Sequence, residues 1–274
     1  MKRILSTALT LTLALGFTTG CAAGKKLNVG RTAASIFISD EQESKLGLQV
    51  KQELETKEKI KYVEDPAIVE YVRTVSTRIL QQANKDRQGV KWTVNVIDDP
   101  KTVNAFATPG GYLYVYTGLL LAADNEAELA GVMGHEAGHV VGRHSAQSML
   151  LQYGQQAVID AALGKNAGTV SQIAASLAGN GAALKFSRDN ETEADELGAR
   201  YMSAVAYDPH GLSSFFQKLA NQEGKVPGIL KWMSTHPASA DRVSHINQYI
   251  TQNRLTGAEL GADRLAAIKQ RVRK

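Results

Sequence analysis

The 274-residue sequence contains a single cysteine, Cys21. Because a disulfide needs two thiols and a thiolate metal site needs several, the chain can form neither within itself. A metal ion in this protein would have to be held by histidine and carboxylate side chains. The sequence also has few aromatic residues and a net charge of only +4, of which Lys2 and Arg3 supply two charges. A charge this small gives no indication of nucleic-acid binding.

Long hydrophobic runs are also scarce. The apolar run of residues 4–17 is shorter than the roughly 20 residues that cross a bilayer, and it follows a basic start. This layout predicts a secretory signal peptide over residues 1–20. Cys21 stands at the expected cleavage point and so resembles the lipidated cysteine of a bacterial lipoprotein, and Ala22 after it indicates the outer membrane. An ordinary secretory signal with an incidental cysteine is the alternative.

These features predict where the protein lies and how the chain is divided. We expect a periplasmic protein that is anchored to the inner leaflet of the outer membrane through lipidated Cys21. Residues 21–38 are small and polar and would form a tether. Residues 39–274 contain no linker long enough to separate domains and are predicted to fold as a single domain.

Both helical and strand patterns occur in the predicted domain. Residues 39–59 have a charged amphipathic pattern that predicts a helix, and a second helix is expected to begin at the Asp65-Pro66 pair. Residues 90–98 alternate as in a strand, and residues 103–118 predict two short strands around a Pro-Gly-Gly turn. The remainder is predicted to be helical. The predicted fold class is therefore α+β and mostly α-helical.

The helical remainder divides into several segments. Residues 145–183 are rich in Ala, Gly, Gln and Ser, with apolar spacing that suits two packed helices. Asp208 and Pro209 begin another predicted helix, and residues 240–274 suit two more.

The segment GVMGHEAGHVVGRH, residues 131–144, is unusual because it fits a helix yet contains four glycines. A glycine inside a helix costs about 1 kcal/mol relative to alanine. Asn125, with Glu128 three residues later, is predicted to cap the start of this helix. On a helical wheel, one stripe carries only small residues and would let a neighbouring element approach closely. Its members are Ala127, Gly131, Gly134, Gly138, Gly142 and Ser145.

Three polar side chains of this helix point to metal chemistry. His135 and His139 lie four residues apart and so share one side of the helix, with Glu136 beside His135. Two histidines on a buried helix are costly unless their nitrogens are used, and zinc binds neutral imidazole well. The motif His-Glu-x-x-His therefore indicates a zinc site with a carboxylate beside its open position. The alternative is a chance match. His144 projects well away from the pair and is expected to make a packing or polar contact.

A catalytic zinc usually has three protein ligands, and the third is expected on another helix. The segment SRDNETEADELG, residues 187–198, offers a carboxylate. Glu191 and Asp195 lie four residues apart, so both can face the metal helix. Glu191 can be the ligand, and Asp195 can accept the outer hydrogen bond of a ligating histidine and so fix its tautomer. Glu193 points elsewhere on the wheel. The alternative for such an acidic run is a solvated helix face.

Four segments together resemble a known family. In order along the chain they are NAFATPGGYLYVYTGLL, NEAELAGVMGHEAGHVVGRH, SRDNETEADELG and STHPASADRV. They resemble the zinc metallopeptidases that include HtpX and the CAAX prenyl proteases, and above all the soluble periplasmic branch with BepA and LoiP. The resemblance covers roughly residues 40–255. It implies a zincin-like (gluzincin) core with a small β-sheet or hairpin beside the active-site helix.

The resemblance implies a role for each residue of the two helical motifs. One zinc ion per chain would be held by His135, His139 and Glu191. Glu136 would be the general base, and Asp195 would contact a ligating histidine from outside.

The resemblance also assigns a role to the segment STHPASADR. Its histidine, His236, would lie over the metal, where it would either stabilise the oxyanion or occupy the water position as a brake. Arg242 accompanies it in the motif. Without the resemblance, a histidine before Pro237 would be taken for a surface turn residue. His210 and His245 match no motif and are expected to be structural.

The NAFA segment indicates how a substrate would bind. A strand that ends beside the metal can pair its backbone with an extended peptide. Asn104 and Ala105 would be the contact points. A plain hairpin is the alternative.

Together these features predict a zinc-dependent endopeptidase of the bacterial cell envelope. Its expected substrates are misfolded or unassembled periplasmic and outer-membrane proteins, and its expected partner is the outer-membrane assembly machinery. The alternative is a zinc-binding, chaperone-like assembly factor with little proteolysis. A third interpretation is a purely structural lipoprotein.

Overall fold

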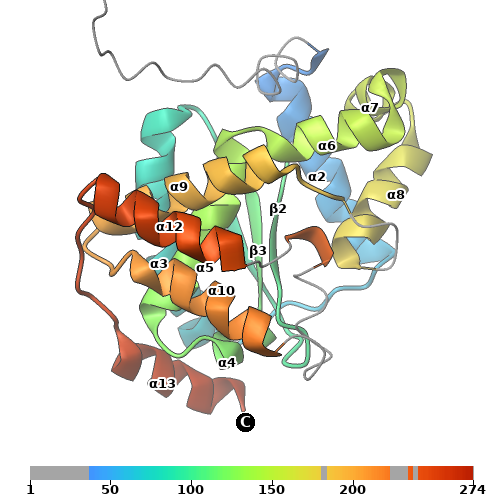
Figure 1. Cartoon of the computed structure of the whole chain (residues 1–274). Coiled ribbons are helices and arrows are strands. Elements are labelled where there is room, and N and C mark those ends of the chain that lie inside the picture. The colour runs from blue at the N-terminus through green and yellow to red at the C-terminus, as the bar shows by residue number, and fades with distance from the viewer. Residues whose placement is uncertain (1–36, 180–183, 223–233, 237–239, 274) are drawn as a thin grey trace, which may run out of the picture.

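The computed structural model describes residues 37–179, 184–222, 234–236 and 240–273 (Figure 1). The predicted signal peptide and Cys21 lie outside these residues, as does most of the predicted tether, so those assignments remain predictions. In the described part of the chain, no helix combines the length and the hydropathy that crossing a membrane requires.

The described residues form a mostly helical α+β fold with one small sheet, as predicted. Two helices precede the sheet, and they are α2 (Asp40–Thr56) and α3 (Pro66–Asp86). The strands are β1 (Thr93–Ile97), β2 (Ala105–Thr108) and β3 (Tyr112–Tyr116). The helices that follow are α4 (Thr117–Ala122), α5 (Glu126–Val141), α6 (His144–Tyr153), α7 (Gln155–Ala162), α8 (Ala167–Ala178), α9 (Arg188–Ala204), α10 (His210–Gln222), α12 (Ala240–Gln252) and α13 (Ala262–Val272).

Both early helices begin at capping side chains. The Ser39 hydroxyl accepts a hydrogen bond from the Gln42 amide (3.2 Å), and the Asp65 carboxylate accepts one from the Ala67 amide (2.9 Å). Each cap satisfies one of the amides that the first turn leaves without a helical partner. Pro66 has no amide hydrogen and therefore loses nothing at the first position of α3.

The three strands form one sheet in the order β1-β3-β2. β2 and β3 are antiparallel and are joined by the predicted Pro-Gly-Gly turn, in which Gly110 and Gly111 have φ values of 81° and 95° that favour glycine. β1 pairs in parallel with β3, with Thr93 opposite Tyr112. β2 is therefore an edge of this sheet, and it packs beside α5.

The two faces of the sheet contribute to two hydrophobic clusters, because successive side chains of a strand alternate between faces. One face, which includes Leu113 and Val115, packs into a cluster with α3, α5, α9 and α10. The other face includes Phe106 and Tyr114, whose stacked rings have centroids 4.6 Å apart. It packs into a second cluster with α2, α7 and α8, which lie on the opposite side of the sheet from α9 and α10 (Figure 1).

The region 145–183 folds differently from the prediction. Residues 145–179 contain most of α6 and all of α7 and α8 instead of two helices, and the preceding helix ends at Val141 instead of continuing to residue 145. The cause is backbone conformation. Arg143 has a φ of 57° and Gly154 a φ of 84°, and a right-handed helix does not accommodate such values.

The small residues of α5 allow α9 to approach closely, as the stripe predicts. A side-chain carbon at Gly138 would lie 2.9 Å from the Ala194 Cα, and one at Gly134 would lie 3.0 Å from the Gly198 Cα. Carbon atoms in contact are normally about 3.5–4.0 Å apart, so glycine is required at both positions. The stripe serves more than one neighbour, because Gly131 faces α10 instead.

Candidate metal centre

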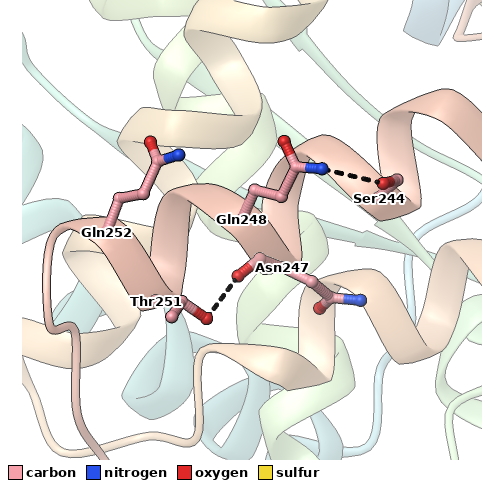
Figure 2. A pocket seen from close by; sticks show the side chains of 5 residues that line it. All are labelled: Ser244, Asn247, Gln248, Thr251 and Gln252. Atoms are coloured by element: carbon pink, nitrogen blue, oxygen red, sulfur yellow. Dashed lines mark hydrogen bonds between the residues drawn. The ribbon is translucent and has the colours of Figure 1, made fainter.

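One surface pocket lies along α12 (Figure 2). Its lining side chains all come from this helix, and they are Ser244, Asn247, Gln248, Thr251 and Gln252. None of them is ionisable, and the two hydrogen bonds drawn in Figure 2 stay within the helix. The pocket therefore offers no acid, base or anionic metal ligand. The side chains that can carry chemistry lie together inside the protein instead.

Helix α5 supplies two imidazoles and a carboxylate to the interior. The Asn125 side chain accepts a hydrogen bond from the Glu128 amide (3.0 Å) and so caps the helix as predicted. The stripe of small residues faces neighbouring helices, and the polar side chains His135, Glu136 and His139 flank it. All three are buried. Burial of three such groups is costly unless they interact with other polar groups or with an ion.

Helix α9 supplies two carboxylates to the same place. The Ser187 hydroxyl caps its first turn by accepting a hydrogen bond from the Asn190 amide (3.2 Å). Glu191 and Asp195 follow four residues apart, and both are buried against α5. The prediction that both acidic side chains face the histidine helix therefore agrees with the structure.

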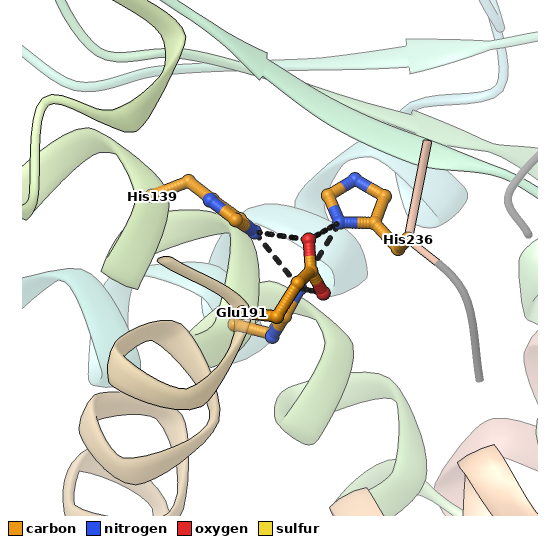
Figure 3. Close-up of side chains that lie close together, drawn as sticks. His139, Glu191 and His236 are labelled. Carbon is orange, nitrogen blue, oxygen red and sulfur yellow. Dashed lines mark hydrogen bonds and ion pairs between the residues drawn. The ribbon is translucent and has the colours of Figure 1, made fainter. Parts of the chain in front are cut away.

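The third contribution comes from residues 234–236. His236 is buried, although it precedes a proline and would otherwise have been taken for a turn residue. In Figure 3 its ring points toward His139 and Glu191, which come from α5 and α9. Three segments that are distant in sequence thus meet at one point.

The donor atoms of this cluster lie close enough to share one ion. The His135 Nε2 lies 3.0 Å from the His139 Nε2 and 3.2 Å from the His236 Nδ1. The nearest oxygens of Glu191 lie 3.5 Å, 3.6 Å and 3.1 Å from the nitrogens of His135, His139 and His236, respectively. All four donors lie within 4.8 Å of one another.

These separations fit a tetrahedral zinc ion. Zinc binds imidazole nitrogen and carboxylate oxygen at about 2.0–2.2 Å, so neighbouring donors of a tetrahedral site are about 3.3–3.6 Å apart. Imidazole nitrogen and carboxylate oxygen are also both ordinary zinc ligands. The described residues therefore fit a metal ion at this point, with His236 as a fourth donor beside the three predicted ligands.

Two further side chains hold the cluster from outside. The Asp195 Oδ1 lies 2.8 Å from the His135 Nδ1, on the side of the ring away from the other donors. Arg242 donates two hydrogen bonds to Asp195 (2.9 Å and 2.7 Å), and its Nη1 lies 2.8 Å from the Glu191 Oε2. Such outer contacts fix the orientation of a ligating imidazole and of a ligating carboxylate.

The electrostatic environment favours the metal-binding forms of the ligands. Burial alone would raise the pKa of Glu191, but the charges of His236 and Arg242 outweigh it and lower that pKa to about 2. Burial, and then the charges of the neighbouring imidazoles, lower the pKa of His139 well below its usual value. A carboxylate and a neutral imidazole are the forms that bind a metal ion.

The predicted general base lies next to the fourth donor. The Glu136 Oε1 lies 3.5 Å from the His236 Nε2, so the same imidazole faces the donor cluster with one nitrogen and Glu136 with the other. In this conformation His236 lies between the predicted base and the other donors.

The structure corrects one prediction about a polar side chain. His144 does not project away from the pair, because its Nδ1 lies 2.9 Å from the His139 Nδ1. Glu193 does lie outside the donor cluster, as expected, and its Oε2 lies 3.3 Å from the His144 Nε2. The error follows from treating residues 125–145 as one continuous helix, whereas the chain turns at Arg143.

One aromatic residue of the site has no motif that could have identified it. The half-buried ring of Phe186 stacks on His139, with centroids 4.0 Å apart, and on His236, with centroids 5.0 Å apart. Phe186 stands just before α9 and covers both imidazoles. Its position next to Ser187, which caps α9, is the only sequence signal that it carries.

The remaining predicted residues lie outside the donor cluster. Asn104 and Ala105 are buried at the start of the edge strand β2. His210 and His245 lie near the surface and pair with carboxylates. His210 pairs with Asp208 at 3.0 Å, and His245 pairs with Glu196 of α9 at 2.9 Å. Both histidines therefore have the structural role that was expected of them.

Comparison with known proteins supports the same kind of site. The model of Peptidase family M48 matches residues 66–250. The chain is 34% identical over 182 residues to the mitochondrial metalloendopeptidase OMA1 of Schizosaccharomyces pombe, which covers 66% of this chain and 53% of that protein. It is 29% identical over 222 residues to the beta-barrel assembly-enhancing protease of Yersinia pestis, with coverage of 78% and 45%. It is 28% identical over 235 residues to the protein of the same name from Escherichia coli, with coverage of 81% and 47%.

The chain spans about half the length of the curated relatives that it matches. The family match itself covers more than half of this chain and includes α5, α9 and all four donor residues. The chain therefore belongs to peptidase family M48, a family of zinc metallopeptidases, as the resemblance of its motifs predicts.

Proposed function

We propose that this protein is a zinc-dependent endopeptidase. One zinc ion per chain would be held by His135, His139 and Glu191. The observation that carries the proposal is the convergence of buried imidazole and carboxylate donors at separations that fit one tetrahedral ion. Family membership supports the same reading.

Zinc bound at this point would polarise the scissile carbonyl and make a water molecule acidic. Glu136 is the proposed general base: a carboxylate oxygen takes the proton of the attacking water and later gives it to the leaving amide nitrogen. Asp195 and Arg242 are proposed to keep the ligands oriented through the contacts that they make with His135 and Glu191.

His236 is proposed to act as a brake. Its Nδ1 lies 3.2 Å from the His135 Nε2 and 3.1 Å from the Glu191 Oε1, so this nitrogen stands where a fourth donor would be. A water molecule can take that place only when the imidazole moves away. Phe186 stacks on the His236 ring and would favour the resting position.

The substrate is proposed to bind along β2. This strand is an edge of the sheet and packs beside α5, so an extended peptide could add its backbone to it. Asn104 and Ala105, at the start of the strand, are the proposed contacts.

The names of the bacterial relatives support a role in the cell envelope. Two of them are called beta-barrel assembly-enhancing protease. We therefore propose that the substrates are misfolded or unassembled periplasmic and outer-membrane proteins, and that the assembly machinery of that membrane is a partner. Lipidation of Cys21 would anchor the protein to the inner leaflet of the outer membrane.

Cleavage of an unfolded protein tests the proposed activity. The wild-type chain, with zinc, is expected to cleave casein at internal bonds, and Glu136→Gln is expected to lower the rate by about 10²–10⁴-fold while zinc still binds. His236→Ala is expected to raise the rate. His245→Ala changes an imidazole outside the cluster and should leave the rate unchanged. Equal cleavage by the wild type and Glu136→Gln would refute the proposed mechanism.

A second candidate function is a zinc-binding assembly factor with little proteolysis. The position of His236 favours this function, because an imidazole that permanently occupied the fourth coordination position would leave no place for water. This function predicts tight binding of an unfolded outer-membrane protein without cleavage by either the wild type or His236→Ala. Cleavage that appears in His236→Ala and disappears in its double variant with Glu136→Gln would decide for the peptidase.

A further inference from the structure

His144 occupies an unusual position behind the metal ligand His139. It is the first residue of α6 and is 0% exposed. Its ring meets the His139 ring edge-on, with centroids 5.0 Å apart and Nδ1 atoms 2.9 Å apart. On its other side, its Nε2 lies 3.3 Å from the Glu193 Oε2, and Glu193 belongs to α9. Three side chains from three helices therefore form a row that leads from the donor cluster toward the surface.

The backbone between α5 and α6 is shaped to place this ring. Arg143 adopts the left-handed conformation, with a φ of 57°, and so turns the chain back toward α5. The Arg143 guanidinium is held by Glu43 through a 2.8 Å hydrogen bond and by the carbonyl of Ile38. A side chain at Gly142 would collide with the His144 imidazole, so glycine is required there.

The hydrogen bonds of the row are compatible with only one arrangement of protons when His139 binds a metal. The His139 Nε2 faces the donor cluster and must keep its lone pair for the metal, so the proton of that ring is on Nδ1. The His144 Nδ1, 2.9 Å away, must then accept that proton in a hydrogen bond. The His144 proton is consequently on Nε2, where it faces the Glu193 carboxylate.

We propose that His144 and Glu193 are positioning residues for His139, which they hold in the tautomer and orientation that bind the metal. Glu193 fixes the tautomer of His144, and His144 fixes that of His139. This inference rests on the proposed function, because it takes His139 to be a zinc ligand. The other histidine of the motif is supported differently, since a carboxylate contacts His135 directly.

The affinity of the full chain for zinc tests the proposal without any activity measurement. Competition with a chromophoric chelator at neutral pH would give the dissociation constants of His144→Leu, Glu193→Leu and the double variant. Loss of an outer partner weakens metal binding by about 10–100-fold, so we expect His144→Leu to fall in this range and Glu193→Leu to fall nearer its lower end. The double variant should bind zinc as His144→Leu does, because Glu193 acts through His144.

Matched controls separate this role from general packing. His245 and Glu196 form another imidazole–carboxylate pair, 2.9 Å apart, that lies outside the donor cluster. His245→Leu and Glu196→Leu should leave the zinc affinity unchanged. His144→Asn places a carbonyl oxygen where the His144 Nδ1 stands and should recover part of the affinity lost in His144→Leu.

Three results would overturn the proposal. The first is a Glu193→Leu variant that binds zinc within twofold of the wild type. The second is a double variant in which the two losses multiply. The third is a His144→Asn variant that loses as much affinity as His144→Leu. Glu193 is 26% exposed, so its replacement tests the row even where a His144 variant does not fold. A wild type that binds no zinc would instead refute the proposed function itself.

Discussion

Two helix pairs of the molecule, α5–α9 and α2–α8, are packed in different ways. Helices α5 and α9 meet through backbone, because a side-chain carbon at Gly138 would lie only 2.9 Å from the Ala194 Cα. Helices α2 and α8 meet through ordinary apolar side chains such as Leu54 and Ile173, both of which are fully buried. The α5–α9 pair buries polar groups that can bind an ion. The α2–α8 pair is held mainly by apolar side chains, which stabilise the fold. Stability and metal binding should therefore respond differently to changes in the two pairs.

The largest loss of stability is expected for a change between α2 and α8, which we call the apolar pair. Leu54→Ala removes a buried side chain and leaves a cavity, which should lower the free energy of unfolding by about 2–5 kcal/mol. The zinc affinity of the folded fraction should not change. Urea unfolding and chelator competition measure the two quantities. A large loss of zinc affinity in folded Leu54→Ala would show that the two pairs are coupled.

Low pH should destabilise the contact between α5 and α9, which we call the polar pair. The folded-state pKa of Glu191 is about 2, below the usual 4.5, so its contribution to stability is present above pH 4.5 and is lost as the pH falls from 4.5 to 2. In zinc-free protein this contribution is up to about 3 kcal/mol. The free energy of unfolding of the zinc-free wild type and of zinc-free Glu191→Gln, measured between pH 2 and pH 4.5, gives this contribution. Equal slopes for the two proteins would contradict the prediction.

Zinc itself should stabilise only through the polar pair. At a free zinc concentration 100 times the dissociation constant, the free energy of unfolding should rise by about 2.7 kcal/mol. Leu54→Ala should keep this increment, and Glu191→Gln should lose most of it. Thermal unfolding with and without a chelator would measure the difference, and an equal increment in both variants would place the ion elsewhere.

Adding one methyl group by a Gly→Ala substitution should also distinguish the two helix pairs, with a smaller loss of stability. Gly138→Ala forces α5 and α9 apart and should lower stability by about 1–3 kcal/mol, together with the zinc affinity. The matched change in α8, Gly168→Ala, meets no atom closer than 3.5 Å and should be neutral or stabilising by up to about 1 kcal/mol. Similar stabilities of the two variants in urea would show that α9 can shift without cost.

The smallest effect is expected at Leu151 of α6, which is 88% exposed. Leu151→Ser removes no buried contact, so the free energy of unfolding should stay within about 0.5 kcal/mol of the wild type. Zinc affinity should also be unchanged. A larger change by urea unfolding would mean that this residue is covered in solution.

Local patterns predicted most of the elements and pointed to three of the four residues that the structure brings into the donor cluster. Capping residues such as Asp65 and Asn125 begin helices as expected. The residue types and spacing of His135, His139 and Glu191 pointed to side chains of α5 and α9 that lie together in the structure. Helical periodicity carries this information because it fixes which side chains share a face.

The positions of His144 and His236 were not predicted by local patterns, because they depend on irregular backbone segments. On a continuous helix, His144 would lie about 140° around the axis from His139, since each residue advances about 100°. The left-handed Arg143 cancels that offset, and no periodic pattern encodes it. His236 lies outside any regular pattern too, and its place beside the donors followed only from the family resemblance.

The ion pairs of Arg242 with Glu191 and Asp195 also affect the charge balance of the site. Glu136, Glu191 and Asp195 bring three negative charges into the interior, and Arg242 returns one positive charge. Two negative charges are therefore in excess when the imidazoles are in their neutral, metal-binding form. A divalent cation makes this interior electrically neutral, whereas a monovalent ion leaves a residual charge in a medium of low dielectric constant. Because the arginine comes from α12, that neutrality is reached only after the C-terminal part of the chain has folded back onto the first two motifs.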